Sequence, residues 1–127
     1  MNKNLELIRQ KIEAIRFGLL RLTEGPEPLT MQVSALVENG PRLNCVITDG
    51  EKKNSLLNRQ VSFIQKNGED YLYISGKVDD EVDTTKKTIS MRILKASWFT
   101  RKKKGSAVWL QQKCTYETPD IDLGKAS

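Results

Sequence analysis

The sequence predicts a mainly β domain (α+β), in which an antiparallel sheet closes into a small barrel and helices cover its open edges and ends. Two features of the pattern predict this class: short apolar segments alternate with a period of two residues, and turns with Asn-Gly pairs join them into hairpins. So many hairpins argue against a doubly wound parallel fold, whose strands need long crossovers. The length of 127 residues fits one domain, which we assign to residues 1–127.

The N-terminal segment, residues 4–16, is predicted to be an amphipathic helix. Its apolar side chains recur at spacings of three and four residues: Leu5, Ile8, Ile12 and Ile15. Charged side chains of both signs lie away from that face: Glu6, Arg9, Lys11 and Glu13. The mixed charge favours a lid or buttress on the sheet over a membrane anchor.

The next segments predict a strand and then a hairpin. "FGLLRL" (17–22) is the strand, and the prolines and glycine of residues 23–28 end it. Residues 29–48 form the hairpin, whose first strand places one set of side chains on a shared face: Met31, Val33, Ala35 and Val37. Asn39-Gly40 suits its turn.

A second hairpin is predicted from "QVSFIQ" (60–65) and "YLYISGKVD" (71–79). The turn between these strands contains Asn67-Gly68, a pair that tolerates positive φ. Gly76 inside the second strand indicates a β-bulge or a close approach of another backbone.

A second helix is predicted over residues 83–97, because Ile89 and Ile93 are four residues apart and Asp83 or Thr84 can cap its N-terminus. A basic loop at residues 100–105 then leads to a last strand at 106–117. Residues from about 118 to 127 read as a polar tail.

Composition narrows the function classes. No apolar run approaches the roughly 18 residues that span a bilayer, and the N-terminus lacks a signal-peptide core, so we expect a cytoplasmic protein. Cys45 and Cys114 lie in alternating apolar segments and are predicted to be buried structural thiols. The absence of histidine excludes His-based catalysis and the common zinc sites, so we predict no metal, and demanding chemistry would need a borrowed cofactor. The net charge of +5 favours anionic partners.

The stretch "RLNCVITDGEKKNSLLN" (42–58) is the strongest candidate for such a contact. A strand delivers the Thr48 hydroxyl to a sheet edge, and Lys52 and Lys53 follow at the start of a short turn. A hydroxyl donor and a nearby ammonium suit a phosphate. The alternative is an ordinary strand end with a solvated loop.

The order of these segments resembles the FMN-binding split-barrel superfamily that includes pyridoxamine 5'-phosphate oxidase, and within it the branch of bacterial general stress proteins. The similar segments are "IRFGLL", Val46-Ile47-Thr48, the turn with Lys52-Lys53, Ile74-Ser75-Gly76 with acidic residues behind it, and the pair Trp98-Phe99. The similarity covers about residues 5–117 and depends on pattern and order rather than on one specific motif.

The resemblance implies an antiparallel split β-barrel with an N-terminal helix and short covering helices. It further implies a homodimer that holds FMN at the subunit interface, with the flavin carrying any hydride chemistry. The positions that correspond to the cofactor site are Gln32, Val33, Ser34, Ile47, Thr48, Lys52, Lys53 and Trp98. Gln32-Val33 stands where this branch usually has an Arg-Pro pair whose arginine reaches the phosphate.

The function expected from this resemblance is that of a flavin-dependent oxidoreductase or a flavin carrier in a stress response. The sequence indicates neither a substrate nor a catalytic residue. Two alternatives stay open: a small basic barrel that binds nucleic acid through residues 100–105, for which strand aromatics give no further support, and a cofactor-free dimer with an interaction role.

Overall fold

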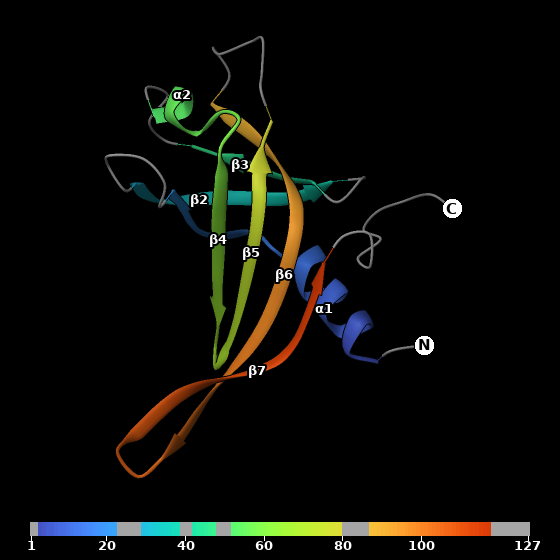
Figure 1. Cartoon of the computed structure of the whole chain (residues 1–127), viewed down its shortest axis with the longest axis vertical. Helices are drawn as coiled ribbons and strands as arrows, with labels where there is room; N and C mark the ends of the chain where they lie inside the picture. The colour runs from blue at the N-terminus through green and yellow to red at the C-terminus, as the bar shows by residue number, and fades with distance from the viewer. Residues whose placement is uncertain (1–2, 23–28, 39–41, 48–51, 80–86, 118–127) are drawn as a thin grey trace.

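The computed structural model describes residues 3–22, 29–38, 42–47, 52–79 and 87–117. Two helices and seven strands occur in these ranges (Figure 1). In chain order they are α1 (Lys3–Glu13), β1 (Phe17–Leu22), β2 (Leu29–Glu38), β3 (Arg42–Val46), α2 (Lys53–Leu56), β4 (Gln60–Asn67), β5 (Asp70–Val78), β6 (Thr88–Lys104) and β7 (Ala107–Glu117). The predicted N-terminal helix, first strand and two hairpins are confirmed. The polar tail lies outside the described residues.

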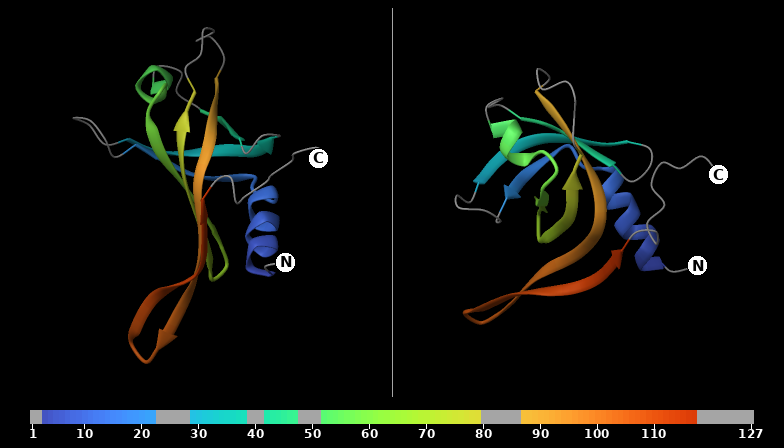
Figure 2. Two further views of the ribbon diagram at one scale, coloured as in Figure 1. Left: turned by 45° about the vertical axis from the view of Figure 1, so that its right-hand side comes forward. Right: turned by 45° about the horizontal axis from the view of Figure 1, so that its top comes forward.

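All seven strands belong to one antiparallel sheet in the order β3-β2-β1-β4-β5-β6-β7. An additional pairing of β3 with the first part of β6, from Arg42↔Arg92 to Val46↔Thr88, joins the two sides of the sheet. Six strands therefore close into a ring, and β7 extends the sheet beyond it along the second part of β6 (Figure 2). The fold is mostly β and antiparallel, as the sequence predicts.

The core lies inside this ring and follows the period of two. On β1, Leu20 and Leu22 point inward, while Phe17 and Leu19 are exposed on the outer face. On β2 the predicted inward set is buried or half-buried: Met31, Val33, Ala35 and Val37. Cys45 is also fully buried, which confirms its predicted role, and Cys114 is half-buried.

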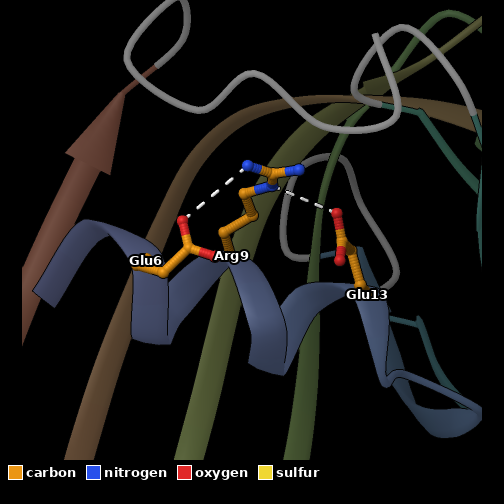
Figure 3. A network of polar contacts seen from close by, with 3 residues as sticks. All are labelled: Glu6, Arg9 and Glu13. Atoms are coloured by element: carbon orange, nitrogen blue, oxygen red, sulfur yellow. Dashed lines mark hydrogen bonds and ion pairs between the residues drawn. The ribbon is translucent and has the colours of Figure 1, made fainter. Parts of the chain in front are cut away.

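Helix α1 packs its apolar face against the core and keeps charges outside. Ile8 and Ile12 of the helix and Ile15 just after it are fully buried, and each contributes roughly 1.5–3 kcal/mol relative to exposure. On the opposite face, Arg9 pairs with Glu6 at 3.7 Å and with Glu13 at 3.2 Å (Figure 3). Because these pairs are exposed, they contribute little to stability, and burial of the isoleucines holds the helix in place.

The predicted helix over residues 83–97 is wrong from Thr88 onward, because these residues form the first part of β6. Residues 83–86 and the predicted cap fall outside the described residues. Ile89 and Ile93 share a face in a strand as well as in a helix, since four residues are two full strand periods. Met91, buried between them, decides in favour of the strand. Pairing with both β3 and β5 then fixes it.

A β-bulge confirms the expectation at Gly76. The register of β5 with β6 shifts between Ser75 and Gly76, where Leu94 is the extra residue on β6. A Cβ at Gly76 would lie 2.5 Å from the Arg92 carbonyl oxygen, so only glycine allows this approach. Before the bulge the odd-numbered residues of β6 face inward, and after it the even-numbered residues do. Ala96 and Trp98 therefore continue the inner face after Ile93.

The predicted basic loop at residues 100–105 is also wrong. Thr100–Lys104 is the end of β6, and the turn to β7 contains Gly105 with φ of 61°. The last β5 partner on β6 is Thr100, so residues 101–110 have strand partners only within the β6–β7 hairpin. Arg101 is still anchored to the ring, because its backbone N–H donates a hydrogen bond to the Glu69 carbonyl oxygen at 2.7 Å. We call residues 101–110 the arm, which projects beyond the ring in Figure 1.

Candidate functional site: a groove on the outer face of the ring

A groove of about 710 Å³ lies on the outer face of the ring, mainly on β1 and β2. Strand pairing explains its position, because Phe17, Ser34 and Val46 are direct partners across three strands and therefore share one face. Leu19 forms a similar row with Gln32 on one side and Ile64 on the other. The groove is lined by Phe17, Gly18, Leu19, Gln32, Val33, Ser34, Val46, Ile64, Lys66 and Tyr71.

The floor of the groove is apolar and open to solvent. Phe17 and Leu19, neighbours on the outer face of β1, are 67% and 38% exposed, and Val46, on the other side of Ser34, is 48% exposed. Contiguous exposed apolar surface of this kind marks a ligand site or a protein interface. The groove is therefore the strongest candidate for a functional surface on the ring.

Polar groups surround this floor. Gln32 and Ser34 are exposed on β2, as the alternation of that strand predicts, and they supply amide and hydroxyl groups. Lys66 supplies a positive charge, with its Nζ 5.8 Å from the centre of the Tyr71 ring. An apolar floor with a few hydrogen-bonding groups is the usual composition of a small-molecule site.

Gly18 allows β1 to pack closely against the core beneath the groove. It lies between Phe17 and Leu19 and faces inward, where a Cβ would be 2.5 Å from Phe63 Cζ and 2.6 Å from the Ile64 carbonyl oxygen. Glycine therefore lets β1 settle directly on the buried Phe63 ring. This close packing fixes the outward side chains of β1 at the base of the groove.

The predicted site residues of β2 and β3 occupy different environments. Gln32, Val33 and Ser34 all line the groove, although the Val33 side chain itself is buried in the core. Ile47 is fully buried, and its backbone N–H donates a hydrogen bond to the Lys87 carbonyl oxygen at 2.8 Å. Thr48 lies outside the described residues.

The two predicted lysines differ in accessibility. Lys52 is exposed just before α2, whereas Lys53, the first residue of that short helix, is fully buried. A ligand in solvent can therefore reach Lys52 but not Lys53 in this structure. Ile47 and Lys52 are close in sequence, and α2 therefore begins soon after the end of β3.

Trp98 does not line the groove. It lies on the inner side of β6, in a separate cavity beneath α1, where Lys11 Nζ is 4.4 Å from the centre of its ring. The structure thus brings together the β2 residues of the predicted site but separates them from Trp98.

Four prominent groove residues were not predicted: Phe17, Leu19, Lys66 and Tyr71. The alternation within "FGLLRL" contains a signal for the first two, because a strand that is apolar on both faces places some apolar residues outside. Lys66 and Tyr71 flank the Asn67-Gly68 turn and reach the groove only through the pairing of β4 with β1.

The thiols do not contribute a reactive group to this site. Burial raises the pKa of the Cys45 thiol to about 12, and burial also raises the pKa of Cys114. Both therefore stay protonated at neutral pH, when a thiol is a poor nucleophile.

A solved structure shares this fold. The crystal structure of a protein named general stress protein 26, from Jannaschia sp. CCS1, superposes with a TM-score of 0.57 and 10% sequence identity, and the match covers 84% of this chain and 83% of that one. No protein-family model matches the chain, and no curated protein sequence matches it. None of the helices in the described residues is long and apolar enough to cross a membrane.

Proposed function

We propose that the protein is a homodimeric FMN-binding protein of the split-barrel type, related to stress proteins, and that the outer groove holds the flavin. The observation that carries this proposal is the groove itself, where an apolar floor meets the Gln32 and Ser34 side chains predicted for the cofactor site. The structural likeness to a general stress protein supports the fold on which the proposal depends.

The residues of the groove fit the parts of a flavin. Phe17, Leu19 and Val46 offer apolar surface to the isoalloxazine ring, and Gln32 and Ser34 offer hydrogen bonds to its polar edge or to the ribityl chain. A volume of about 710 Å³ lies within the usual range of roughly 300–1,000 Å³ for such ligands. The bound flavin would supply hydride or electron transfer, while these residues bind and orient it.

The phosphate requires a positive charge, which the usual arginine of β2 does not supply here because Gln32 occupies its place. Lys66 lies in the groove and Lys52 is exposed before α2. We assign the phosphate contact to one of these two ammonium groups. Lys53 is the less suitable candidate, because its side chain is buried.

A second copy of the chain would complete the site. The floor residues Phe17 and Val46 stay largely exposed in one chain, together with the neighbouring Leu36, which is 50% exposed. Burial of these side chains against the same face of another copy would remove apolar surface from water and enclose the flavin.

A titration with FMN and with riboflavin tests this assignment, because the two ligands differ only in the phosphate. We expect FMN to bind more tightly, and Lys66→Ala or Lys52→Ala to weaken FMN binding about five- to tenfold while riboflavin affinity stays unchanged. Quenching of flavin fluorescence measures both constants. Lys77→Ala, an exposed lysine of β5 outside the groove, is the matched control.

The proposal fails if the wild-type protein quenches neither ligand. If both ligands bind equally well and neither lysine variant changes FMN affinity, the flavin assignment survives but the phosphate assignment is wrong.

The arm supports a second candidate function, binding of duplex nucleic acid. It carries Arg101, Lys102, Lys103 and Lys104 on one strand, and the chain has no carboxylate side chain from Lys95 to Tyr116. Arg101 pairs with Glu69 of the β4–β5 turn at 3.8 Å, so the three lysines carry most of the available charge. Cross-strand pairing puts Lys102 beside the half-exposed Trp109. A two-stranded ribbon with this charge fits the width of a major groove.

The salt dependence of binding tests this candidate. We expect affinity for a short DNA duplex to fall steeply between about 50 and 200 mM salt, and the double variant Lys102→Ala/Lys104→Ala to reduce the log–log slope by about two. Fluorescence anisotropy measures this, with Lys77→Ala as the control. Absence of binding at low salt would exclude the candidate without affecting the flavin proposal.

A further inference from the structure

The inner face of the ring changes from apolar to polar below α1. One row across three strands consists of buried apolar residues, Phe63, Ile74 and Ala96. The next row is Gln65, Leu72 and Trp98, and the row after it is Asn67, Asp70 and Thr100. The core therefore ends within the second row, at Leu72, and polar side chains line the inner face toward the β4–β5 turn.

Helix α1 covers these polar rows without filling the space above them. A cavity of about 220 Å³ lies between the helix and strands β4, β5 and β6. Leu7 of the helix, Ala14 just after it and Leu72 of the sheet give it apolar walls, while Gln65, Asp70 and Trp98 supply polar groups. This volume is below the usual range for drug-sized ligands and suits a single ring.

The charges in the cavity neutralise each other. Lys11 Nζ donates a hydrogen bond to Asp70 Oδ2 at 2.9 Å, and Thr100 Oγ1 donates one to Asp70 Oδ1 at 3.0 Å. The ammonium also lies over the Trp98 ring. Because both charges already have partners, the cavity favours a neutral ligand over an ion.

Two polar atoms of residues that line this cavity are buried and have no hydrogen-bond partner within the part of the chain that the structure describes. They are Gln65 Oε1, an acceptor, and Trp98 Nε1, a donor. Both atoms are covered in this conformation, so a ligand contacts them once the two side chains turn toward the cavity. The indole N–H lies close enough to Asp70 to help lower its pKa, but its geometry does not make a hydrogen bond. A buried donor or acceptor without a partner costs roughly 1–3 kcal/mol, so a molecule that satisfies both gains affinity.

We propose that this cavity binds a small, neutral, planar molecule that carries both an N–H and a C=O group, such as a single-ring lactam or amide. The ligand carbonyl accepts from Trp98 Nε1, and the ligand N–H donates to Gln65 Oε1. Leu7, Ala14 and Leu72 enclose its apolar edges. The cavity shares Tyr71 with the flavin groove, but this proposal uses none of the groove's other residues and does not depend on the flavin proposal.

The test uses the Trp98 indole as a reporter. The chain has two tryptophans, so Trp109→Phe leaves Trp98 as the only one, and its side chain gives a single indole N–H signal in a ¹⁵N-labelled sample. The probes are 2-pyridone, uracil and nicotinamide. We expect at least one of them to move this signal downfield in a saturable way, because the N–H gains an acceptor.

Two comparisons show whether the named groups are responsible. Gln65→Met keeps the length of the side chain but removes the amide, and we expect it to weaken binding of the best probe about five- to tenfold. Gln60→Met, at an exposed position of the same strand, is the matched control and should leave affinity unchanged. A probe methylated at its N–H should also bind more weakly.

The proposal is overturned if no probe shifts the Trp98 signal at concentrations of about 10 mM, or if Gln65→Met binds as well as the wild type. If Trp109→Phe does not fold, the melting temperature of the wild-type protein replaces the signal. The proposal is supported if the probe raises the melting temperature of the wild type but not that of Gln65→Met. It is contradicted if the probe changes both melting temperatures equally.

Discussion

At the scale of single residues, Gly18 shows how a core contact positions the groove. A methyl group at this position would overlap the Phe63 ring and the Ile64 carbonyl, and neither a packed ring nor a strand backbone can move cheaply. We expect Gly18→Ala to destabilise the protein by roughly 1–3 kcal/mol, measured by denaturant unfolding.

The control is Gly68→Asn, in the β4–β5 turn. Gly68 has φ of 63°, a Cβ added there would have no neighbour within 4 Å, and Asn tolerates this backbone conformation. Gly68→Asn should lower the free energy of unfolding much less than Gly18→Ala does. Equal losses would mean that the close packing of β1 on Phe63 contributes nothing specific.

Asp70 makes stability depend on pH. Partial burial acts to raise the pKa of this carboxyl, but hydrogen bonds from Lys11 and Thr100 outweigh it, so the pKa is lowered overall. A lowered pKa in the folded state adds stability above the unfolded value, and this is lost as pH falls through the folded value. We expect Asp70→Asn to be less stable than the wild type at pH 7, with the gap narrowing below roughly pH 4.

Unfolding curves of both proteins at about pH 7 and pH 3 measure this difference. Glu69→Gln, next to Asp70 and much more exposed, is the control and should show a smaller gap. A gap for Asp70→Asn that stays constant between the two pH values would show that the Lys11–Asp70 pair does not titrate with folding.

At the scale of elements, local pattern predicted the hairpins but not the long β6 strand. The β2–β3 and β4–β5 hairpins follow from alternation and from turn residues within the same segment. Ile89 and Ile93 share a face in a helix and in a strand, and the β3 residues that pair with this segment are more than 40 residues away in sequence. Tertiary pairing therefore overrides the local helical period.

The arm is the element whose stability should differ most from the ring. Beyond Thr100 its two strands have no third strand beside them among the described residues, and a two-stranded ribbon in water is marginally stable. We expect backbone amides of residues 102–110 to exchange with solvent within seconds to minutes, and amides of residues 89–96 to exchange much more slowly. Hydrogen–deuterium exchange measures both segments in one experiment. Equal protection would mean that the arm packs on another surface.

At the scale of the whole molecule, the site could be predicted only in part. Gln32 and Ser34 follow from the alternation of one strand, which the sequence displays. Phe17 and Lys66 join them only because β1 lies between β2 and β4, an arrangement that long-range pairing determines. Trp98 was assigned to the same site from the resemblance, but the bulge at Gly76 turns it to the inner face.

The proposed dimer makes a prediction at this scale. We expect the wild-type protein to be a dimer by light scattering, and Phe17→Asp to be a monomer with little loss of thermal stability, because Phe17 lies outside the core. Leu110→Asp, also exposed but on the arm, is the control and should stay dimeric. A dimeric Phe17→Asp together with a monomeric Leu110→Asp would place the interface on the arm.

The most direct test of the central claim is the absorption spectrum of the purified protein between about 300 and 500 nm, recorded after incubation with FMN and removal of unbound ligand. The account predicts a retained flavin band at about one FMN per chain, reduced in Lys66→Ala or Lys52→Ala and unchanged in Lys77→Ala. A wild-type protein that keeps no flavin and shows no spectral change in the presence of FMN would contradict the claim that the groove is a flavin site.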